Sequence, residues 1–293
     1  MSEPPFGYLP APGRPKLELP HGARVAVWIG LNVEHYPFGR PGLSISPITA
    51  GLPVDPMNFG WRDYGPRVGI WRVMDVLDRL GMRASVLLNS DVCRRYPAIV
   101  EAGRERDWAW LAHGRDNATL QTGMSREEEQ RYLAEVVETI ERGTGQRPLG
   151  WLGPALTETE HTPELLSELG LTYVCDWCND DEPYRLDVPG AQMLSVPYSV
   201  EANDITLLAS KNLTGPEYMQ VLIDQFDVLY EEGQRSGKVM AIPLHPFLVG
   251  QPFRIGYLRS ALEHIAGHER VWLATSDEIA EWYLASTAAA VAT

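Results

Sequence analysis

The sequence predicts an α/β fold, a distorted (β/α) barrel of about seven strands. Short hydrophobic runs alternate with longer amphipathic segments along the chain, a pattern typical of parallel strands joined by crossover helices. About seven such alternations fit a barrel better than an open sheet. The 293 residues suffice for one α/β barrel, and we find no internal repeat and no domain linker. We therefore expect a single domain over residues 1–293.

The expected strands are short apolar runs bounded by polar or turn-forming residues. In chain order they are Arg24–Leu31, Arg83–Asn89, Trp108–Ala112, Leu171–Asp176, Gln192–Pro197, Val239–Leu244 and Arg270–Ala274. Three of these runs lead into polar side chains, which are Glu34, His113 and His245. Because the carboxyl ends of parallel strands meet at one edge of a sheet, where α/β enzymes carry their chemistry, we expect the three side chains to form one hydrolytic site.

The helices between the strands are indicated by apolar faces and by signals at their ends. The helix Pro66–Leu80 has a proline in its first turn and Gly81 as its stop. Its apolar face is expected to hold Ile70, Trp71, Met74, Leu77 and Leu80. Capping boxes at Ser125–Glu128 and Thr214–Glu217 open two long helices. The remaining helices are expected at Tyr96–Arg106, from Thr162 to Gly170, around Tyr257–Ala266 and from Ser276.

Residues 35–67 form a long segment without a regular pattern. The segment is rich in proline and glycine, and its aromatic residues are Tyr36, Phe38, Phe59, Trp61 and Tyr64. A loop of this length in a compact domain is usually functional or disordered, and the aromatic content argues against disorder. We expect residues 35–67 to form either a lid over the strand ends or a contact with a neighbouring subunit.

Composition excludes several classes of partner. The net charge is −14 and no basic stripe is visible, so we expect no nucleic-acid partner. No run of 18 apolar residues exists, so we expect no membrane span. The three cysteines are a sparse, odd set, which fits a reducing compartment, and the first residues do not read as a signal peptide. We therefore expect a cytoplasmic protein.

The common catalytic motifs are absent. The sequence contains no G-x-S-x-G, no H-E-x-x-H, no G-x-x-x-x-G-K and no G-x-G-x-x-G. His264 and His268 form an H-x-x-x-H, whose spacing could place two metal ligands on one helix face. The pair lies at an expected helix C-terminus, where cations are favoured by the helix dipole. We interpret it as surface capping.

The three strand-end residues each allow a structural and a chemical role. A carboxylate such as Glu34 is costly after an apolar strand unless it has a partner or a task, so it is either an ion-paired group or a metal ligand or base. His113 is either a core histidine, a metal ligand or a group that polarises a carbonyl. His245 lies between Pro243 and Pro246. This stiff turn suits a general acid that must keep its orientation.

Further motifs accompany these residues over most of the chain. They are Leu31-Asn32-Val33-Glu34, Ala112-His113-Gly114 with Asn117, Gly150-Trp151-Leu152-Gly153-Pro154, Asp176 with Asp180–Tyr184, Asp224–Asp227, and Leu244-His245-Pro246. With them the chain resembles the polysaccharide-deacetylase (NodB-homology) superfamily from about Arg24 to Tyr283. It resembles in particular the branch of metal-independent allantoinases, cyclic imidases and peptidoglycan-deacetylase-like proteins. The resemblance implies a NodB-like barrel that hydrolyses an amide C–N bond.

The resemblance also implies site roles. In typical members one aspartate is the base, a second aspartate and an H-x-x-x-H pair bind a divalent metal, and a later histidine is the acid. Here the base position falls on Asn32, the ligand positions on Glu34, His113 and Asn117, and the acid position on His245. An alternative register places the base on Glu34 and a ligand on His35.

Two of these positions depart from the family pattern. Asn32 cannot act as a general base, and the Asn117 amide is a poorer zinc ligand than imidazole. Two cofactor states therefore stay open. One is no cofactor. The other is a weakly held divalent metal such as zinc, on Glu34 and His113 with either Asn117 or His35.

We therefore expect hydrolysis of a small amide, such as a cyclic imide or a ureide. Glu34 would activate water, provided that burial raises its pKa toward neutrality. Asn117 would stabilise the oxyanion together with backbone N–H groups, His113 would polarise the carbonyl or hold a metal, and His245 would protonate the leaving nitrogen. The residues expected to bind substrate are Asn32, Trp151, Asp180, Tyr198 and Phe247.

Two other functions stay open at this point. One is zinc-dependent N-deacetylation of an acetylated sugar, and the other is non-catalytic binding of a small molecule on the same fold. The expected partners are a small-molecule amide and further copies of the chain. A homotetramer is what the resemblance implies for this branch.

Overall fold

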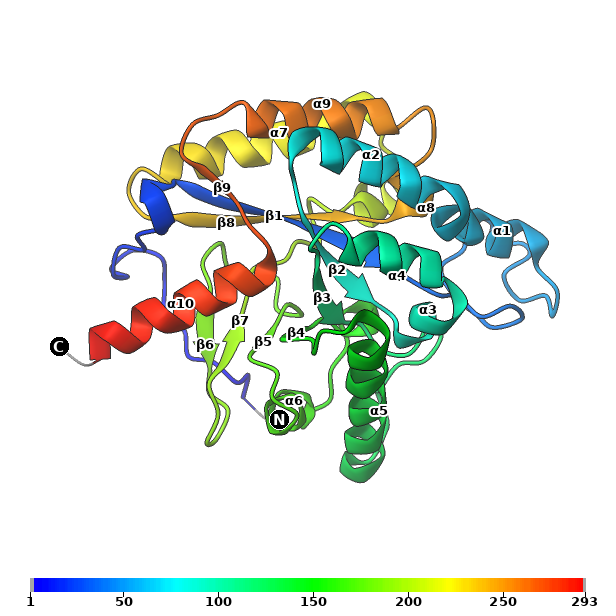
Figure 1. Ribbon diagram of the computed structural model, residues 1–293, viewed down its shortest axis with the longest axis horizontal. Helices are drawn as coiled ribbons and strands as arrows, with labels where there is room; N and C mark the ends of the chain where they lie inside the picture. Colours follow the sequence, from blue (N-terminus) through cyan, green and yellow to red (C-terminus); the bar gives the residue numbers. More distant parts are fainter. Residues whose placement is uncertain (1–2, 292–293) are drawn as a thin grey trace.

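The computed structural model describes residues 3–291 and has an α/β architecture (Figure 1). The strands are β1 (Val25–Val33), β2 (Ala84–Leu88), β3 (Ala109–Ala112), β4 (Gly150–Trp151), β5 (Tyr173–Val174), β6 (Tyr184–Leu186), β7 (Met193–Ser195), β8 (Lys238–Leu244) and β9 (Val271–Leu273). The helices are α1 (Pro56–Tyr64), α2 (Ile70–Leu80), α3 (Ser90–Arg95), α4 (Pro97–Arg104), α5 (Arg126–Thr144), α6 (Thr162–Glu168), α7 (Gly215–Glu232), α8 (Pro246–Val249), α9 (Ile255–Ala266) and α10 (Ser276–Val291).

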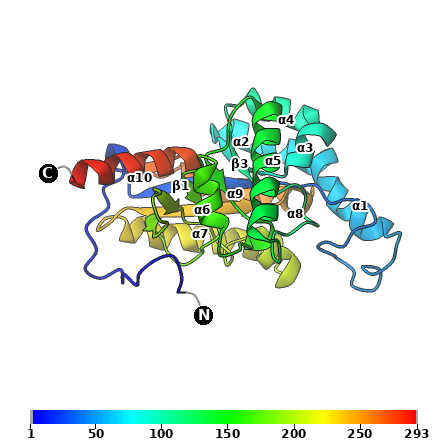
Figure 2. The same ribbon diagram turned by 90° about the horizontal axis from the view of Figure 1, so that it is seen from below.

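The strands form one curled sheet in the order β6-β7-β5-β4-β3-β2-β1-β8, with β9 pairing the start of β1. Every pairing is parallel except β6 with β7. The sheet forms a half-barrel, so the predicted fold class, a distorted (β/α) barrel of about seven strands, is confirmed. The view from below shows α7 and α10 on opposite sides of β1 (Figure 2).

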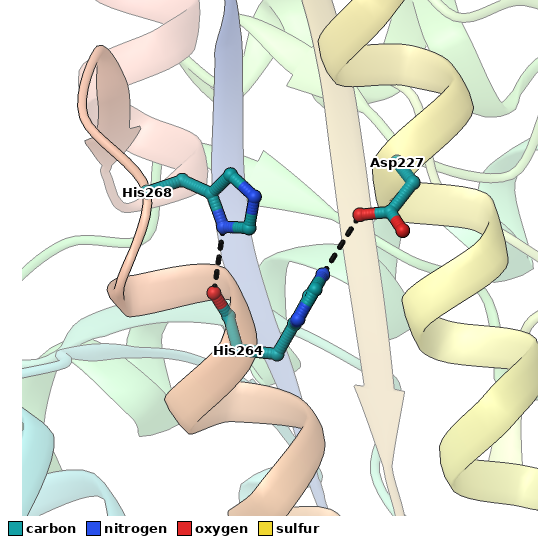
Figure 3. Close-up of side chains that lie close together, drawn as sticks. All are labelled: Asp227, His264 and His268. Atoms are coloured by element: carbon teal, nitrogen blue, oxygen red, sulfur yellow. Dashed lines mark hydrogen bonds and ion pairs between the residues drawn. The ribbon is translucent and has the colours of Figure 1, made fainter.

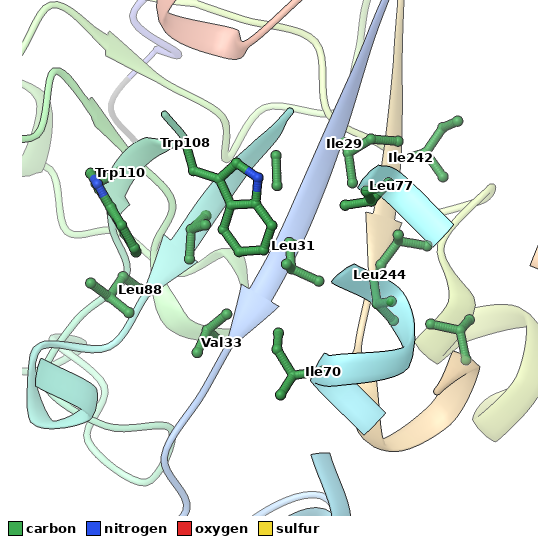
Figure 4. Packing of buried hydrophobic residues seen from close by; sticks show 14 of the residues in the cluster. Ile29, Leu31, Val33, Ile70, Leu77, Leu88, Trp108, Trp110, Ile242 and Leu244 are labelled. Atoms are coloured by element: carbon green, nitrogen blue, oxygen red, sulfur yellow. The ribbon is translucent and has the colours of Figure 1, made fainter. Parts of the chain in front are cut away.

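Both faces of the central strand β1 are buried over its whole length, as expected for a parallel strand covered on both sides. Its odd-numbered residues pack against α2 and the outer residues of β8 (Figure 4). The outer-layer side chains drawn there include Ile29, Leu31, Ile70, Leu77, Ile242 and Leu244. Each fully buried aliphatic side chain of this kind stabilises the fold by about 1.5–3 kcal/mol.

The even-numbered residues of β1 point into the half-barrel. Trp28 packs there with side chains from β2, β3, β5 and β7, which are Leu87, Leu111, Tyr173 and Leu194. Because side chains alternate along a strand, Asn32 and Glu34 belong to the same inner face as Trp28. Which side chains of a strand face the inside of the half-barrel therefore decides which residues reach the catalytic edge.

Several element boundaries differ from the sequence prediction. The expected helix Tyr96–Arg106 is α4, and α3, which precedes it, was not predicted. Pro97 disfavours helical backbone at Tyr96, whose φ and ψ are −131° and 55°, so the two helices stay separate. The expected helix Pro66–Leu80 begins with a π-helical turn, and Trp71 on its expected apolar face is 38% exposed. Gly81 does stop it, with the left-handed φ of +63° that glycine tolerates. Both predicted capping boxes form.

Residues 35–67 are not wholly irregular, since they contain α1. Within residues 3–291, no helix has the length and apolar composition needed to cross a bilayer.

Candidate active site

Glu34, His113 and His245 meet at the carboxyl edge of the sheet. Glu34 follows β1, while His113 and His245 directly follow β3 and β8. In each strand the alternation of side chains turns these residues inward, together with Trp28 and Leu111. The Oε1 atom of Glu34 lies 3.4 Å from Nε2 of His113 and 3.8 Å from Nε2 of His245. All three side chains are at most 6% exposed.

The Glu34 carboxylate is surrounded by His113, His245, Tyr36 and Asn117. Oε2 accepts a hydrogen bond of 2.8 Å from the Tyr36 hydroxyl, and Oε1 accepts one from the Asn117 amide. Burial raises the pKa of Glu34, but the charge of His245, the hydrogen bond and charge of His113 and the Tyr36 hydroxyl outweigh it and lower the pKa to about 2. The expectation that burial raises this pKa toward neutrality is wrong. Glu34 is ionised at neutral pH.

A chain of hydrogen bonds fixes which end of the Asn117 amide faces Glu34. The backbone N–H of His35 donates to Oδ1 of Asn89 (2.8 Å), so Nδ2 of Asn89 is the end that donates to Oδ1 of Asn117 (3.1 Å). Asn117 therefore turns its NH2 group to Glu34 and to the Tyr36 hydroxyl. Both of its N–H groups are thereby used. Asn117 positions the carboxylate and has no N–H left for the expected oxyanion role.

His113 is oriented by the backbone. Its Nδ1 donates to the carbonyl of Leu152 (2.7 Å), so Nε2 faces Glu34. The turn that follows requires Gly114, which has φ +65°, and a Cβ there would lie 2.6 Å from Pro154 and 2.7 Å from the Tyr132 hydroxyl.

His245 is oriented by a residue that the sequence analysis missed. Fully buried Asp204 accepts hydrogen bonds of 2.6 Å from both the Nδ1 and the backbone N–H of His245. Burial lowers the pKa of His245, but the charges of Asp204 and Glu34 and the hydrogen bond to Asp204 raise it more, so the net direction is upward. The surroundings therefore favour the protonated form of His245, whose Nε2 faces Glu34. Asp204 lies in an irregular segment before a π-helical turn (Ile205–Ser210), and no spacing in the sequence marks it.

A small cavity of about 10 Å³, roughly the space that one water molecule needs, opens beside Glu34. Two residues expected to bind substrate, Asn32 and Phe247, line it, and so does Arg62 of α1. The lid segment thus contributes directly to the cavity wall.

Arg62 is a second residue that the sequence analysis missed. It is 6% exposed, its guanidinium lies 4.7 Å from the centre of the Tyr36 ring, and its Nε donates to the Asn58 carbonyl. Among the described residues, its Nη1 has no hydrogen-bond partner. Arg62 is therefore a buried cation with a spare donor beside the cavity.

The structure places three other expected site residues elsewhere. His35, on the outer side of the chain, bonds Tyr96 through Nδ1 and makes no contact with the Glu34 side chain. Trp151 points to the outer layer and is fully buried in the hydrophobic core, because the alternation in β4 turns its neighbour Leu152 inward instead. Asp180 forms an ion pair of 2.7 Å with Arg14. These positions correct the expected roles of His35 as a ligand and of Trp151 and Asp180 in substrate binding.

Asp180 lines a second cavity, whose wall includes Tyr198 as well as Val239 and Ala241 of the first half of β8. The Tyr198 hydroxyl accepts a hydrogen bond of 3.2 Å from the Asn32 amide, which ties Tyr198 to the site.

The residues around Glu34 do not fit the divalent metal that the family resemblance implies. A catalytic zinc needs three strong protein ligands. Glu34 and His113 supply two, but Asn117 presents its NH2 group, and the amide of Asn32 donates to Tyr198 and to the Leu244 carbonyl. The raised pKa of His245 disfavours the neutral imidazole that a metal ligand requires. The donor set therefore favours chemistry carried by protein groups.

Comparisons with known proteins agree with this fold. The family model "Polysaccharide deacetylase" matches residues 62–174. A Schizosaccharomyces pombe protein described as a polysaccharide deacetylase is 29% identical over 236 residues, which are 75% of this chain and 73% of that protein. The peptidoglycan deacetylase of Helicobacter pylori is 28% identical over 219 residues, 64% of this chain and 72% of its own. The crystal structure of Puue allantoinase is 26% identical, with a TM-score of 0.85 over 94% of this chain and 95% of that one.

Proposed function

Because the chain belongs to the polysaccharide deacetylase family, whose members hydrolyse C–N bonds, we propose that it hydrolyses the amide bond of a small cyclic imide or ureide. The observation that carries the proposal is the contact of an ionised Glu34 with His113 and His245, whose Nε2 atoms lie 3.4 Å and 3.8 Å from its carboxylate. The likeness to an allantoinase over almost the whole chain supports the substrate class. The donor set around Glu34, which is poor for zinc, supports a mechanism that uses only protein groups.

The two charges explain how a carboxylate with a pKa of about 2 can act as a base. Burial is the largest influence on Glu34 and raises its pKa, and the charge of His245 is the largest influence that lowers it. When His245 gives its proton to the leaving nitrogen, it loses that charge, and the pKa of Glu34 rises. Transfer of a proton from water to Glu34 is thereby coupled to protonation of the leaving group by His245.

The atoms balance over the cycle. Water adds its oxygen to the carbonyl carbon and gives one proton to Glu34, the C–N bond breaks, and the nitrogen leaves with the proton from His245. Glu34 then returns a proton to His245, whose Nε2 is 3.8 Å away. His113 faces the same carboxylate oxygen, and we assign it to polarising the carbonyl with a second proton carried on Nε2, because its Nδ1–H is already donated to the Leu152 carbonyl.

The test is turnover of a panel of imides, ureides and acetamides by Glu34→Gln. This variant keeps the shape of the side chain but cannot take a proton, so we expect loss of turnover with an unchanged circular dichroism spectrum. Asp78→Asn, on the surface in an ion pair with Arg106, is the matched control and should keep full activity. Full activity of Glu34→Gln would reject the mechanism, and ligand binding without turnover by the wild type would favour a binding protein.

A zinc-dependent N-deacetylase of an acetylated sugar is the second candidate. The family name and the Helicobacter pylori relative favour it. Release of acetate from N-acetylated sugars, lost in chelator and restored by zinc, would establish this function in place of the first.

We also propose that the chain works as a homo-oligomer. The lid segment carries exposed apolar side chains, which are Ile45, Ile48, Leu52, Val54 and Met57. A group of apolar side chains this exposed is typical of a contact surface.

A further inference from the structure

The H-x-x-x-H at His264 and His268 lies far from the catalytic edge. His264 is on α9, His268 is two residues past its end, and Asp227 faces them from α7 (Figure 3). The chain then enters β9, which pairs with the start of β1, whereas Glu34 follows its end. Nine residues of strand span about 30 Å. The cluster is therefore a separate feature on the outer helical layer.

The three side chains are arranged around a common gap. Nε2 of His264 lies 2.7 Å from Oδ1 of Asp227. Nδ1 of His268 donates to the carbonyl oxygen of His264 (2.8 Å), so its Nε2 keeps a lone pair. Figure 3 shows that second nitrogen turned toward the space between His264 and Asp227. The ligand atoms of the three residues lie within 4.8 Å of one another.

Surface capping and an ion pair account for only part of this arrangement. The His268 ring does cap a carbonyl at the end of α9, as expected from the sequence, and His264 does pair with Asp227. Neither contact requires Nε2 of His268 to face the other two groups. A ligating histidine that donates its other ring N–H to a backbone carbonyl is, however, the usual arrangement in metal sites.

The distances fit a tetrahedral ion. Zinc binds histidine nitrogen and carboxylate oxygen at about 2.0–2.2 Å, which places ligand atoms about 3.3 Å apart. The separations of 2.7 to 4.8 Å bracket this value, so small side-chain rotations suffice. The side chains of His264 and Asp227 are 33% and 50% exposed, which leaves an entry path and room for a water ligand.

The rings are held in place by aromatic packing. Phe226 contacts both histidine rings edge-on, with centroids 5.8 Å from His264 and 5.0 Å from His268. Tyr230 packs on His268 and donates its hydroxyl to the Glu269 carbonyl. Because the rings are already restrained, little side-chain freedom remains to be lost when an ion binds.

We propose that Asp227, His264 and His268 form a binding site for a divalent transition-metal ion of the zinc class. The ion joins α7 to α9 on the outside of the barrel and takes no part in the hydrolytic site. Two imidazoles and one carboxylate are a donor set that suits zinc and disfavours magnesium or calcium.

The test is calorimetric titration of the metal-free, full-length protein with zinc chloride, with cobalt(II) absorption as a second readout of tetrahedral coordination. We expect one zinc per chain and a higher Tm with zinc. His268→Gln and Asp227→Asn should each weaken binding at least tenfold. His161→Gln is the matched control, because that histidine is similarly exposed but has only Glu160 nearby.

A second variant separates this site from the catalytic one. His113→Gln should keep the zinc affinity and the Tm shift of the wild type, because it alters only the hydrolytic site. Absence of zinc uptake by the wild type, or uptake that His268→Gln leaves unchanged and His113→Gln abolishes, would overturn the proposal. All variants change partly exposed or catalytic side chains, and circular dichroism checks that each is folded.

Discussion

Replacement of Asp204 by asparagine tests whether the charge on His245 drives the reaction. Asp204 accepts two hydrogen bonds from His245, one from its ring and one from its backbone, both 2.6 Å long. Asparagine has one acceptor oxygen, so one of these two donors would face an NH2 group. The variant therefore removes a buried negative charge and a hydrogen bond together.

The size of the effect follows from the buried pair. Removing one partner of a buried ion pair typically costs about 3–5 kcal/mol. Glu34 stays 3.8 Å away and retains part of the stabilisation of the His245 cation, so we take the lower end of this range. The pKa of His245 should therefore fall in the variant, because burial lowers it and the largest influence that raises it is removed.

The assay is the pH dependence of kcat/KM. His245 must be protonated to act as the acid, so activity is present below its raised pKa and lost as the pH rises through it. In Asp204→Asn this descending limb should move to lower pH, and kcat/KM at neutral pH should fall about 100-fold, mostly in kcat. Asp78→Asn should leave both unchanged. If Asp204→Asn kept the wild-type limb and lost less than threefold in activity, the assignment of His245 as the acid would be wrong.

Three further predictions concern stability, substrate binding and assembly. The pKa of Glu34 is lowered in the folded protein, so the stability that this carboxylate contributes is complete above its ordinary pKa of 4.5 and is lost as the pH falls toward 2. In urea unfolding, the free energy of unfolding should fall by about 3 kcal/mol over this pH range, and by less in Glu34→Gln. Arg62→Met removes the spare buried donor beside the cavity, so KM should rise about tenfold with kcat little changed in steady-state kinetics, and Arg62→Lys should recover part of the loss; an unchanged KM would remove Arg62 from substrate binding. Ile48→Glu with Val54→Glu places charges on side chains that are 91% and 58% exposed; light scattering should report a smaller assembly if residues 35–67 form a subunit contact, and an unchanged mass would leave them only the role of a lid.

The convergence of Glu34, His113 and His245 was predictable because it depends only on strand order and period. Parallel strands present their carboxyl ends at one edge, and alternation along β1, β3 and β8 turns all three residues inward. The same alternation, applied to Gly150-Trp151-Leu152, would have placed Trp151 outside the barrel. The motif alone does not specify which face of β4 its side chains occupy, so it did not support the prediction that Trp151 lines the pocket.

The pKa of Glu34 could not be predicted from the sequence. A buried carboxylate shifts upward when it is alone and downward when cations surround it, and the balance depends on distances between residues 34, 113 and 245. Asp204 escaped detection for a similar reason. It lies 41 residues before His245 in an irregular segment, where neither period nor capping pattern constrains a side chain.

Asparagine at the expected base position, Asn32, and at one expected ligand position, Asn117, changes how the site holds its charge. A metal ion at this edge would supply positive charge to an acidic residue and to the substrate carbonyl. In this chain the positive charge next to Glu34 comes from His245, which is held cationic by Asp204. Asn117, with its amide fixed by Asn89, contributes two N–H groups in place of an imidazole lone pair.

This arrangement links the base and the acid more tightly than a metal site does. A metal ion keeps its charge throughout a reaction, whereas His245 loses its charge when it acts. The carboxylate therefore becomes more basic at the moment when the leaving group is protonated, and each group resets the other through a contact of 3.8 Å. A site of this kind should accept only substrates small enough to place both the carbonyl and the leaving nitrogen between Glu34 and His245.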